Sequence, residues 1–321
     1  MGMVIGQPSW FRIMPLTEDL NTPVGINFSW DAPIYIFPGI QAKPILLWTF
    51  PGGTSGYYQD DAIPVAAMVN LAAHPSLWPV LAGVIALALA PLAFFLWFAY
   101  TRDKLNPEPH GLVLRVFLLG LLAFIPAFLC RQLIPLPYWL TGILLVPVVD
   151  ELAKFAVVKT TVYHHREFDE PVDGIIFAAV AGLGFATLEV VGSMVQAYLR
   201  IAAVGLPDQA LGTSTWLSVL GLFALKGLLL APGQALWSSL WGYTLGRAKF
   251  FAPDQRPGLV GRGLLAAMFA HATFNALAME PNWWLNRLGL VLVIALLGLV
   301  VRRCLNYALA IGDQLGKAQA G

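Results

Sequence analysis

The segment PVVDELAKFAVV, residues 147–158, places Asp150, Glu151 and Lys154 inside a run that is otherwise apolar. Leu, Val and Ile dominate the sequence on both sides, so this segment is expected to lie within a membrane. An ionisable residue near the centre of a bilayer costs about 2.5 to 3.5 kcal/mol, and it is therefore expected to face a partner or water and to serve a function. The three charges predict a buried polar site on a transmembrane helix.

The composition of the whole chain agrees with a membrane location. Of its 321 residues, 58% are hydrophobic and 12% are charged, and the mean hydropathy is +0.70, values typical of polytopic membrane proteins. The net charge of +1 and the absence of a basic block argue against nucleic acid as a partner. Cys130 and Cys304 each lie near the end of an apolar segment, and they predict neither a disulfide framework nor a cysteine metal site.

Seven segments are long and apolar enough to cross a bilayer, which takes about 20 residues per helix. They predict an all-α fold, a polytopic transmembrane bundle of about seven spans, with approximate bounds of 77–99, 111–134, 137–161, 174–198, 214–245, 262–279 and 285–303. The fifth segment is too long for one straight span and carries Ala231-Pro232-Gly233, which predicts a kinked helix or, as an alternative, a short hairpin. Near its end, Trp237 and Trp241 are predicted to anchor it at the membrane interface.

Lysine and arginine residues are distributed unevenly between the two sides of this bundle. With seven spans, eleven of them fall on one side and three on the other, Arg131 among the three. Cytoplasmic loops carry the excess of positive charge, so the C-terminus is predicted to be cytoplasmic and the N-terminus to lie outside. The chain then divides into an extracytoplasmic N-terminal tail (1–76), a transmembrane domain (77–303) and a cytoplasmic C-terminal tail (304–321).

Polar side chains on three later segments are candidate partners of Glu151. The fourth segment carries Glu189, the fifth Gln234, and the sixth His271 and Asn275. With a rise of about 1.5 Å per residue, Glu151, His271, Gln234 and Glu189 lie roughly 14 to 22 Å from the cytoplasmic ends of their segments. Four helices are therefore expected to bring polar groups to one central layer.

Each of these polar residues also has a purely structural explanation. Asp150 and Lys154 are four residues apart and share a helix face, which predicts an ion pair, whereas Glu151 points about 100° away from Asp150 and needs another partner. Glu189 alone could be satisfied by one hydrogen bond between helices, and a lone intramembrane His is as often a packing residue as a ligand. Their common depth favours a site, as do nearby glycines that permit close helix approach, namely Gly182, Gly184 and Gly192.

Four motifs of this chain are similar to those of one protein family. They are YTRDKLNPEPHG (100–111), DELAK (150–154), FDEPVDGIIFAAVAGLGFATLE (168–189) and HATFN (271–275). Over roughly residues 100–279 the chain resembles the PrsW-type intramembrane proteases, part of a larger superfamily that includes the CAAX prenyl endopeptidases and bacteriocin-processing proteins. It departs from the family pattern at Gln234, where the family normally has His, at Lys226, where Arg is usual, and at Asp150, which replaces a Glu.

The resemblance implies hydrolysis of a peptide bond in a transmembrane or membrane-associated protein surrounded by lipid. It implies catalytic roles for Glu151, Glu189, His271 and Asn275, supported by Asp150, Lys154 and Gln234. A carboxylate can act as general base for one water, and Glu151 is the candidate, with His271 and Asn275 as donors to the oxyanion. Alternatively Glu151, Glu189 and His271 could bind Zn and leave one position open for water, although the chain has no HExxH motif.

Two further hypotheses remain from the sequence. The missing His at Gln234 and the shorter acid at Asp150 favour a catalytically impaired pseudoprotease that binds a membrane partner through the same groove. A transporter could use midplane carboxylates to carry protons or cations. The sequence has no recognisable inverted repeat, which argues against the transporter.

Overall fold

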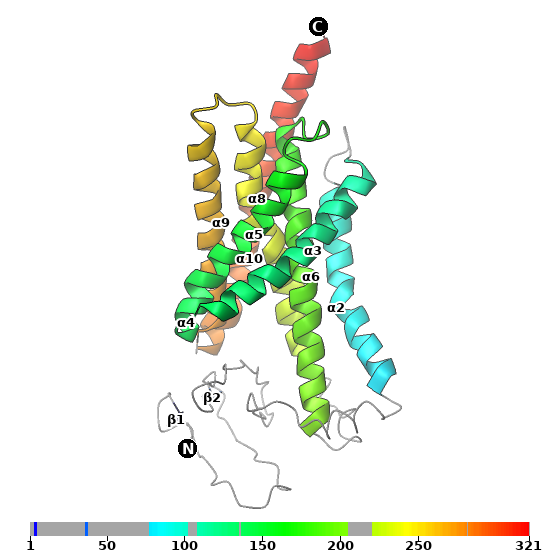
Figure 1. The fold of residues 1–321 in the computed structure, drawn as a ribbon, viewed down its shortest axis with the longest axis vertical. Coiled ribbons are helices and arrows are strands. Elements are labelled where there is room, and N and C mark those ends of the chain that lie inside the picture. The colour runs from blue at the N-terminus through cyan, green and yellow to red at the C-terminus, as the bar shows by residue number, and fades with distance from the viewer. Residues whose placement is uncertain are drawn as a thin grey trace, which may run out of the picture.

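The described part of the chain is a bundle of helices (Figure 1). The computed structural model describes residues 3–4, 36–37, 77–101, 108–134, 136–204, 220–280 and 282–320. In this part the predicted all-α fold is confirmed, apart from an antiparallel pair of two-residue strands, β1 (Met3–Val4) and β2 (Ile36–Phe37). The remainder of the predicted N-terminal tail lies outside the described residues.

The helices follow the predicted segments closely. They are α2 (Leu77–Tyr100), α3 (His110–Leu133), α4 (Tyr138–Leu140), α5 (Val146–Thr161), α6 (Pro171–Val204), α8 (Ala231–Ala248), α9 (Arg256–Ala278) and α10 (Trp283–Ala320), with two π-helical turns, η2 (Thr141–Leu145) and η3 (Lys226–Leu230). The segment 304–321, predicted as a tail, continues α10 as far as Ala320, and the end of this helix projects beyond the others in Figure 1.

Five of the described helices are long and apolar enough to cross a membrane, namely Trp78–Tyr100, His110–Leu133, Pro171–Gln196, Leu220–Ala248 and Trp284–Gln314. The predicted count of seven is not reached and stays a prediction. α5 has only 16 residues and carries Asp150, Glu151 and Lys154, and the apolar run of α9 is interrupted by His271 and Asn275. The candidate site residues lower the mean hydropathy of both helices.

The fifth predicted segment is one continuous helix from Leu220 to Ala248, so the hairpin alternative is wrong. Its π-helical turn η3 directly precedes Pro232, the second residue of α8. A proline inside a helix lacks the N–H group and its ring clashes with the carbonyl four residues earlier, and a wider turn relieves this conflict. The same arrangement recurs where η2 precedes Pro147 in α5. The helices that carry Glu151 and Gln234 therefore each have a π-helical turn just before them.

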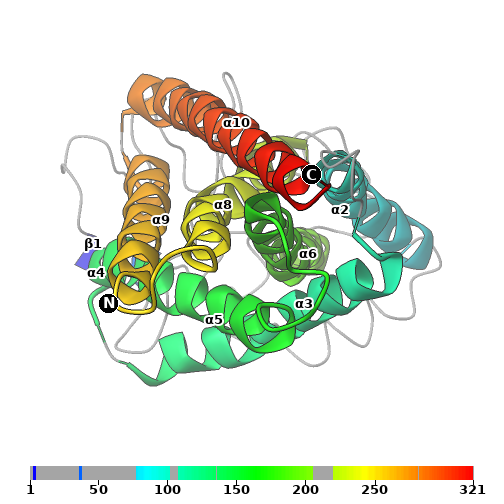
Figure 2. The same ribbon diagram turned by 90° about the horizontal axis from the view of Figure 1, so that it is seen from above.

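α6 and α8 lie at the centre of the bundle, with the other long helices around them (Figure 2). The most apolar stretch of α6 is 83% buried, whereas that of α10 is only 6% buried. Two of the three predicted glycine contacts are confirmed: Gly182 lies against the backbone carbonyl of Gln234 in α8, and Gly184 against that of Phe117 in α3. A side chain at either position would collide with backbone, so glycine permits the close approach of α6 to both neighbours. Gly192 faces open space instead.

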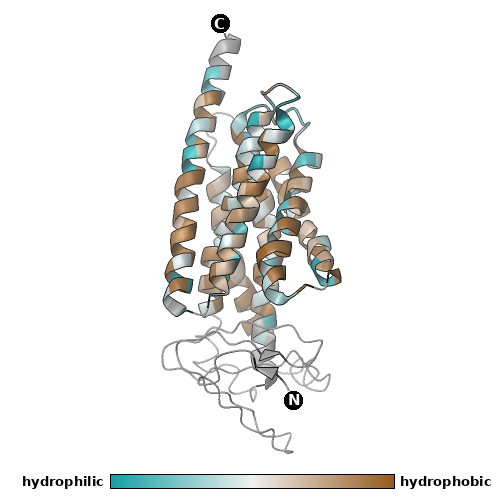
Figure 3. Cartoon of the chain, turned by 90° about the vertical axis from the view of Figure 1, so that its left-hand side faces the viewer, coloured by the Kyte–Doolittle hydropathy of each residue, from teal (hydrophilic) through white to brown (hydrophobic). Residues whose placement is uncertain are grey.

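Large apolar side chains cover the outer surface of the bundle. Phe269 is 76% exposed, Leu265 68% and Trp97 60%. Figure 3 shows hydrophobic residues along most of the length of the helices, with hydrophilic residues gathered toward the end near the C-terminus. Exposed apolar side chains in such number are favourable against lipid tails and unfavourable against water.

Candidate active site

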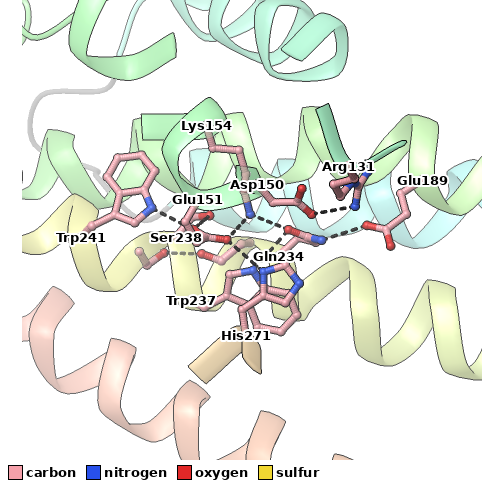
Figure 4. A network of polar contacts seen from close by, with 12 residues as sticks. Arg131, Asp150, Glu151, Lys154, Glu189, Gln234, Trp237, Ser238, Trp241 and His271 are labelled. Atoms are coloured by element: carbon pink, nitrogen blue, oxygen red, sulfur yellow. Dashed lines mark hydrogen bonds and ion pairs between the residues drawn. The ribbon is translucent and has the colours of Figure 1, made fainter. Parts of the chain in front are cut away.

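Charged and polar side chains of α3, α5, α6, α8 and α9 meet in the core (Figure 4). Three of the most buried polar residues, Glu151, Lys154 and Gln234, are 0% exposed, and His271 is 1% exposed. α5 contributes the first two, α8 contributes Gln234, and α9 contributes His271. Of the four residues expected to share a central layer, Glu151, Gln234 and His271 are therefore brought together here.

The carboxylate of Glu151 is the centre of this cluster. Its Oε1 atom accepts a hydrogen bond from Lys154 Nζ and lies 3.3 Å from Nδ1 of His271. Its Oε2 atom accepts hydrogen bonds from Ser238 Oγ at 3.0 Å and from Trp241 Nε1 at 2.9 Å. Both oxygens of a fully buried carboxylate are thus compensated, as a buried charge requires.

The predicted ion pair between Asp150 and Lys154 is wrong. Lys154 Nζ binds Glu151, three residues before it, and Gln234 Oε1 at 2.5 Å. Asp150 instead pairs with Arg131, with 3.2 Å between Oδ2 of Asp150 and Nη1 of Arg131. Arg131 lies in the last turn of α3. Positions three and four residues apart share a helix face equally well, so the sequence spacing alone could not select the partner of Lys154.

Gln234 joins the centre of the cluster to Glu189. Its Oε1 atom accepts from Lys154, and its Nε2 atom donates to Glu189 Oε2 at 2.9 Å. Glu189 also lies 3.6 Å from Nζ of Lys226 in η3. Glu189 therefore reaches the site through the carboxamide of Gln234.

Three carboxylates of the cluster each have a cation of their own. Lys154 pairs with Glu151, Arg131 with Asp150, and Lys226 with Glu189, so these six charges balance. The side chains of these cations are 0%, 11% and 27% exposed in that order. The cluster is therefore fully enclosed at Glu151 and opens to the surroundings at Glu189 and Lys226.

His271 is held by an aromatic stack. Its ring lies 4.5 Å from that of Trp237, with an angle of 14° between the planes. Its Nδ1 atom lies near Glu151 but is not aligned for a hydrogen bond. The stack fixes the plane of the imidazole while leaving this nitrogen available to another group.

Asn275, one helical turn after His271, is bound elsewhere. Its Nδ2 atom donates to the backbone carbonyl of Gly142 at 2.8 Å. Gly142 belongs to η2, the π-helical turn that leads into α5. Asn275 thus ties α9 to the start of the helix that carries Glu151.

Several residues of the cluster were not foreseen as site residues. Trp237 and Trp241, predicted as interfacial anchors, are both 0% exposed and line the site, so that prediction is wrong. Ser238 and Arg131 were also not singled out. Positions 234, 238 and 241 follow the i, i+4, i+7 spacing of one helix face, and this spacing could have placed Ser238 and Trp241 beside Gln234.

The predicted zinc ligands do not form a three-ligand site in this arrangement. Among the described residues, no group of three or more His, Cys, Asp and Glu side chains is placed to hold a metal ion. Glu151 and His271 are neighbours, but Glu189 is engaged by Gln234 and Lys226. The position of a cation beside Glu151 is taken by the ammonium group of Lys154.

The fold and the site together define an integral membrane protein with a balanced, charged centre inside a helical bundle. The family model that matches the chain is described as PrsW family intramembrane metalloprotease, and the match spans residues 108–301. The chain therefore belongs to the PrsW family of intramembrane proteases.

Two relatives of the chain carry the name of this family. The chain is 30% identical over 220 residues to "Protease PrsW" of Geobacillus kaustophilus, covering 66% of this chain and 86% of the relative. It is 26% identical over 207 residues to "Protease PrsW" of Bacillus subtilis, covering 63% of this chain and 85% of the relative. No solved structure matches the chain.

Proposed function

We propose that this protein hydrolyses a peptide bond of a transmembrane or membrane-associated protein, with Glu151 as general base for a water molecule. The observation that carries the proposal is the pairing of Glu151 and His271, 3.3 Å apart and enclosed in the bundle. Membership of the PrsW family supports the same reaction.

The proposed reaction follows from the chemistry of these two groups. A proton of the water passes to Oε1 of Glu151 while the water oxygen bonds to the carbonyl carbon of the peptide, whose oxygen becomes an oxyanion. His271 donates to this oxyanion from Nδ1, which lies beside Glu151 but has no aligned hydrogen-bond partner. Glu151 then returns the proton to the amide nitrogen as the C–N bond breaks.

The other candidate residues have supporting roles in this proposal. Lys154 compensates the charge of Glu151, and Gln234 couples it to Glu189. Asn275 donates one N–H of its side-chain amide to the carbonyl of Gly142, and its role in this proposal is to hold the start of α5 in place. Asp150 is the first acid of the motif, and its ion pair with Arg131 keeps it away from the reacting oxygen.

Zinc is an alternative form of the same proposal. Glu151 and His271 could supply two ligands, whereas Glu189 would first have to leave Gln234 and Lys226. The metal content of the purified protein distinguishes the two forms: stoichiometric zinc that Glu151→Gln abolishes would favour the metal, and activity without bound metal would favour the glutamate and water alone.

Replacing His271 by Ala is expected to lower cleavage of a panel of single-span membrane peptides by about 10²-fold to 10³-fold, because one donor to the oxyanion is lost. The measurement is a steady-state assay in detergent. His164→Ala, an exposed histidine on the loop after α5, serves as the control and should leave the rate unchanged. Equal rates for all three proteins would remove His271 from the mechanism.

The proposed orientation places the N-terminus outside and the C-terminus in the cytoplasm. It is supported by the exposed Arg302 and Arg303 on α10 and by Arg262 on α9, which suit the cytoplasmic side. In this proposal residues 77–303 form the membrane domain, and residues 1–76 form a tail on the outer side. A reporter fused after residue 321 that is active only in the cytoplasm tests the orientation.

A second candidate function is binding of a membrane protein without hydrolysis. The observation that favours it is Gln234, which stands where the family normally has His and whose Oε1 is held by Lys154 and by Trp237 Nε1 at 3.2 Å. A pseudoprotease of this kind would still bind a membrane protein but would not cleave it.

Gln234→His distinguishes the two functions. If the protein is a protease, the wild type cleaves a member of the peptide panel and needs no substitution at this position. If it is a pseudoprotease, the wild type cleaves none of the peptides and Gln234→His restores cleavage. Gln255→His, on the exposed residue before α9, is the control for a histidine placed outside the site.

A further inference from the structure

Glu151 receives two hydrogen bonds from α8 that the mechanism above does not use. Ser238 Oγ and Trp241 Nε1 both donate to the same oxygen, Oε2, at 3.0 and 2.9 Å. Ser238 and Trp241 are both 0% exposed. They are three residues apart in α8, so they share the helix face that is turned toward Glu151.

We propose that Ser238 and Trp241 are positioning residues that fix Oε2 of Glu151 and thereby present Oε1 as the oxygen that takes the proton from water. This inference rests on the proposed hydrolysis. Two donors that converge on one oxygen from different directions stop the carboxylate from rotating about its terminal bond. Oε1 is then held toward Lys154 and His271, where proton transfer takes place.

The hydroxyl group of Ser238 points in a different direction from that of its neighbour Ser239. Ser239 Oγ donates to the carbonyl of Ala235, four residues earlier in its own helix, at 2.7 Å. This is the usual bond of a serine within a helix. Ser238 instead reaches across to α5, as the close-up in Figure 4 shows.

Trp241 has a packing role that can be separated from its hydrogen bond. Its ring meets Phe155 of α5 edge to face, with centroids 5.4 Å apart. The substitution Trp241→Phe keeps an aromatic ring for this contact and removes the indole N–H. The effect of losing the donor can thus be measured without opening a large cavity.

The experiment compares Ser238→Ala, Trp241→Phe and Ser239→Ala in the full-length protein in detergent. If the loss of a hydrogen bond to a charged group raises the activation free energy by the full strength of that bond, the rate of cleavage falls by roughly tenfold to a hundredfold. Ser238→Ala and Trp241→Phe are expected to lower kcat by this factor with little change in KM, because they act on the base and not on peptide binding. Ser239→Ala is expected to keep the wild-type kcat.

A second measurement does not depend on catalysis. Thermal unfolding of Ser238→Ala, of Glu151→Leu, which removes the acceptor, and of the double variant gives the coupling between the two side chains. This coupling is expected to be clearly different from zero for Ser238 with Glu151 and close to zero for Ser239→Ala with Glu151→Leu. An unchanged kcat in both Ser238→Ala and Trp241→Phe, with an active wild type, would overturn the positioning role and leave the proposed hydrolysis intact. A wild type that cleaves no peptide would overturn both, even if the coupling in unfolding is present.

Discussion

Replacing Glu151 by Gln is expected to lower peptide cleavage by up to about 10⁴-fold, the upper range for loss of a general base. Glutamine has nearly the same shape and can still accept hydrogen bonds from Ser238 and Trp241, so the fold should persist. It cannot take a proton from water at neutral pH. The measurement is kcat on the best peptide of the panel, with thermal unfolding recorded for the same preparation.

The control for Glu151→Gln is Glu167→Gln. Glu167 lies on the loop after α5 and pairs with an exposed arginine, Arg166, whose side chain is 88% exposed. The substitution Glu167→Gln changes the same chemical group outside the site, and the variant should cleave the peptide at the wild-type rate. Cleavage by Glu151→Gln within a factor of about three of that control would assign the base to another residue.

Replacing Lys154 by Met is expected to reduce the free energy of unfolding by about 3 to 5 kcal/mol. Lys154 and Glu151 are both completely buried, and methionine would leave the carboxylate without its ion pair. Gln234 would lose a donor in the same step. The measurement is denaturant unfolding in detergent, followed by the secondary-structure signal.

The matched control is Lys159→Met, five residues later in the same helix. The Nζ atom of Lys159 lies over the ring of Tyr163, and its side chain is partly exposed, so a change of less than about 1 kcal/mol is expected. Adding Glu151→Gln to Lys154→Met should recover much of the lost stability, because the unpaired buried charge is removed. Equal losses for Lys154→Met with and without Glu151→Gln would contradict the ion pair as the cause.

Much of the fold could be predicted from the sequence because the bilayer imposes a simple length and composition on each helix. The long apolar segments became α2, α3, α6, α10 and the continuous helix that contains α8. α5 and α9, which were predicted to be spans, are not among these five helices, and the polar residues of the site lower the hydropathy of both. The site layer was also predictable, since depth along a helix follows from counting residues.

The partners within that layer could not be predicted. Lys154 could face Asp150 or Glu151 with equal ease on its own helix, and Arg131 resembled a residue of an outer loop. Whether a side chain near a helix end snorkels to the interface or turns inward depends on what the next helix offers it. Trp241 showed the same ambiguity, because an indole suits both a membrane interface and a buried donor position.

Hydropathy predicted a helical membrane protein, the four motifs indicated its resemblance to the PrsW family, and residue counting predicted that Glu151, Glu189, Gln234 and His271 lie at similar depth. The rotation of each helix about its axis is established only by packing. At Gly182 and Gly184, backbone meets backbone and α6 is seated against α8 and α3. Those contacts set which faces of α6, α8 and α3 meet. Arg131 binds Asp150, and Ser238 and Trp241 bind Glu151, only because α3 and α8 turn these side chains toward α5, since hydrogen bonds between helices require a particular rotation about the helix axis.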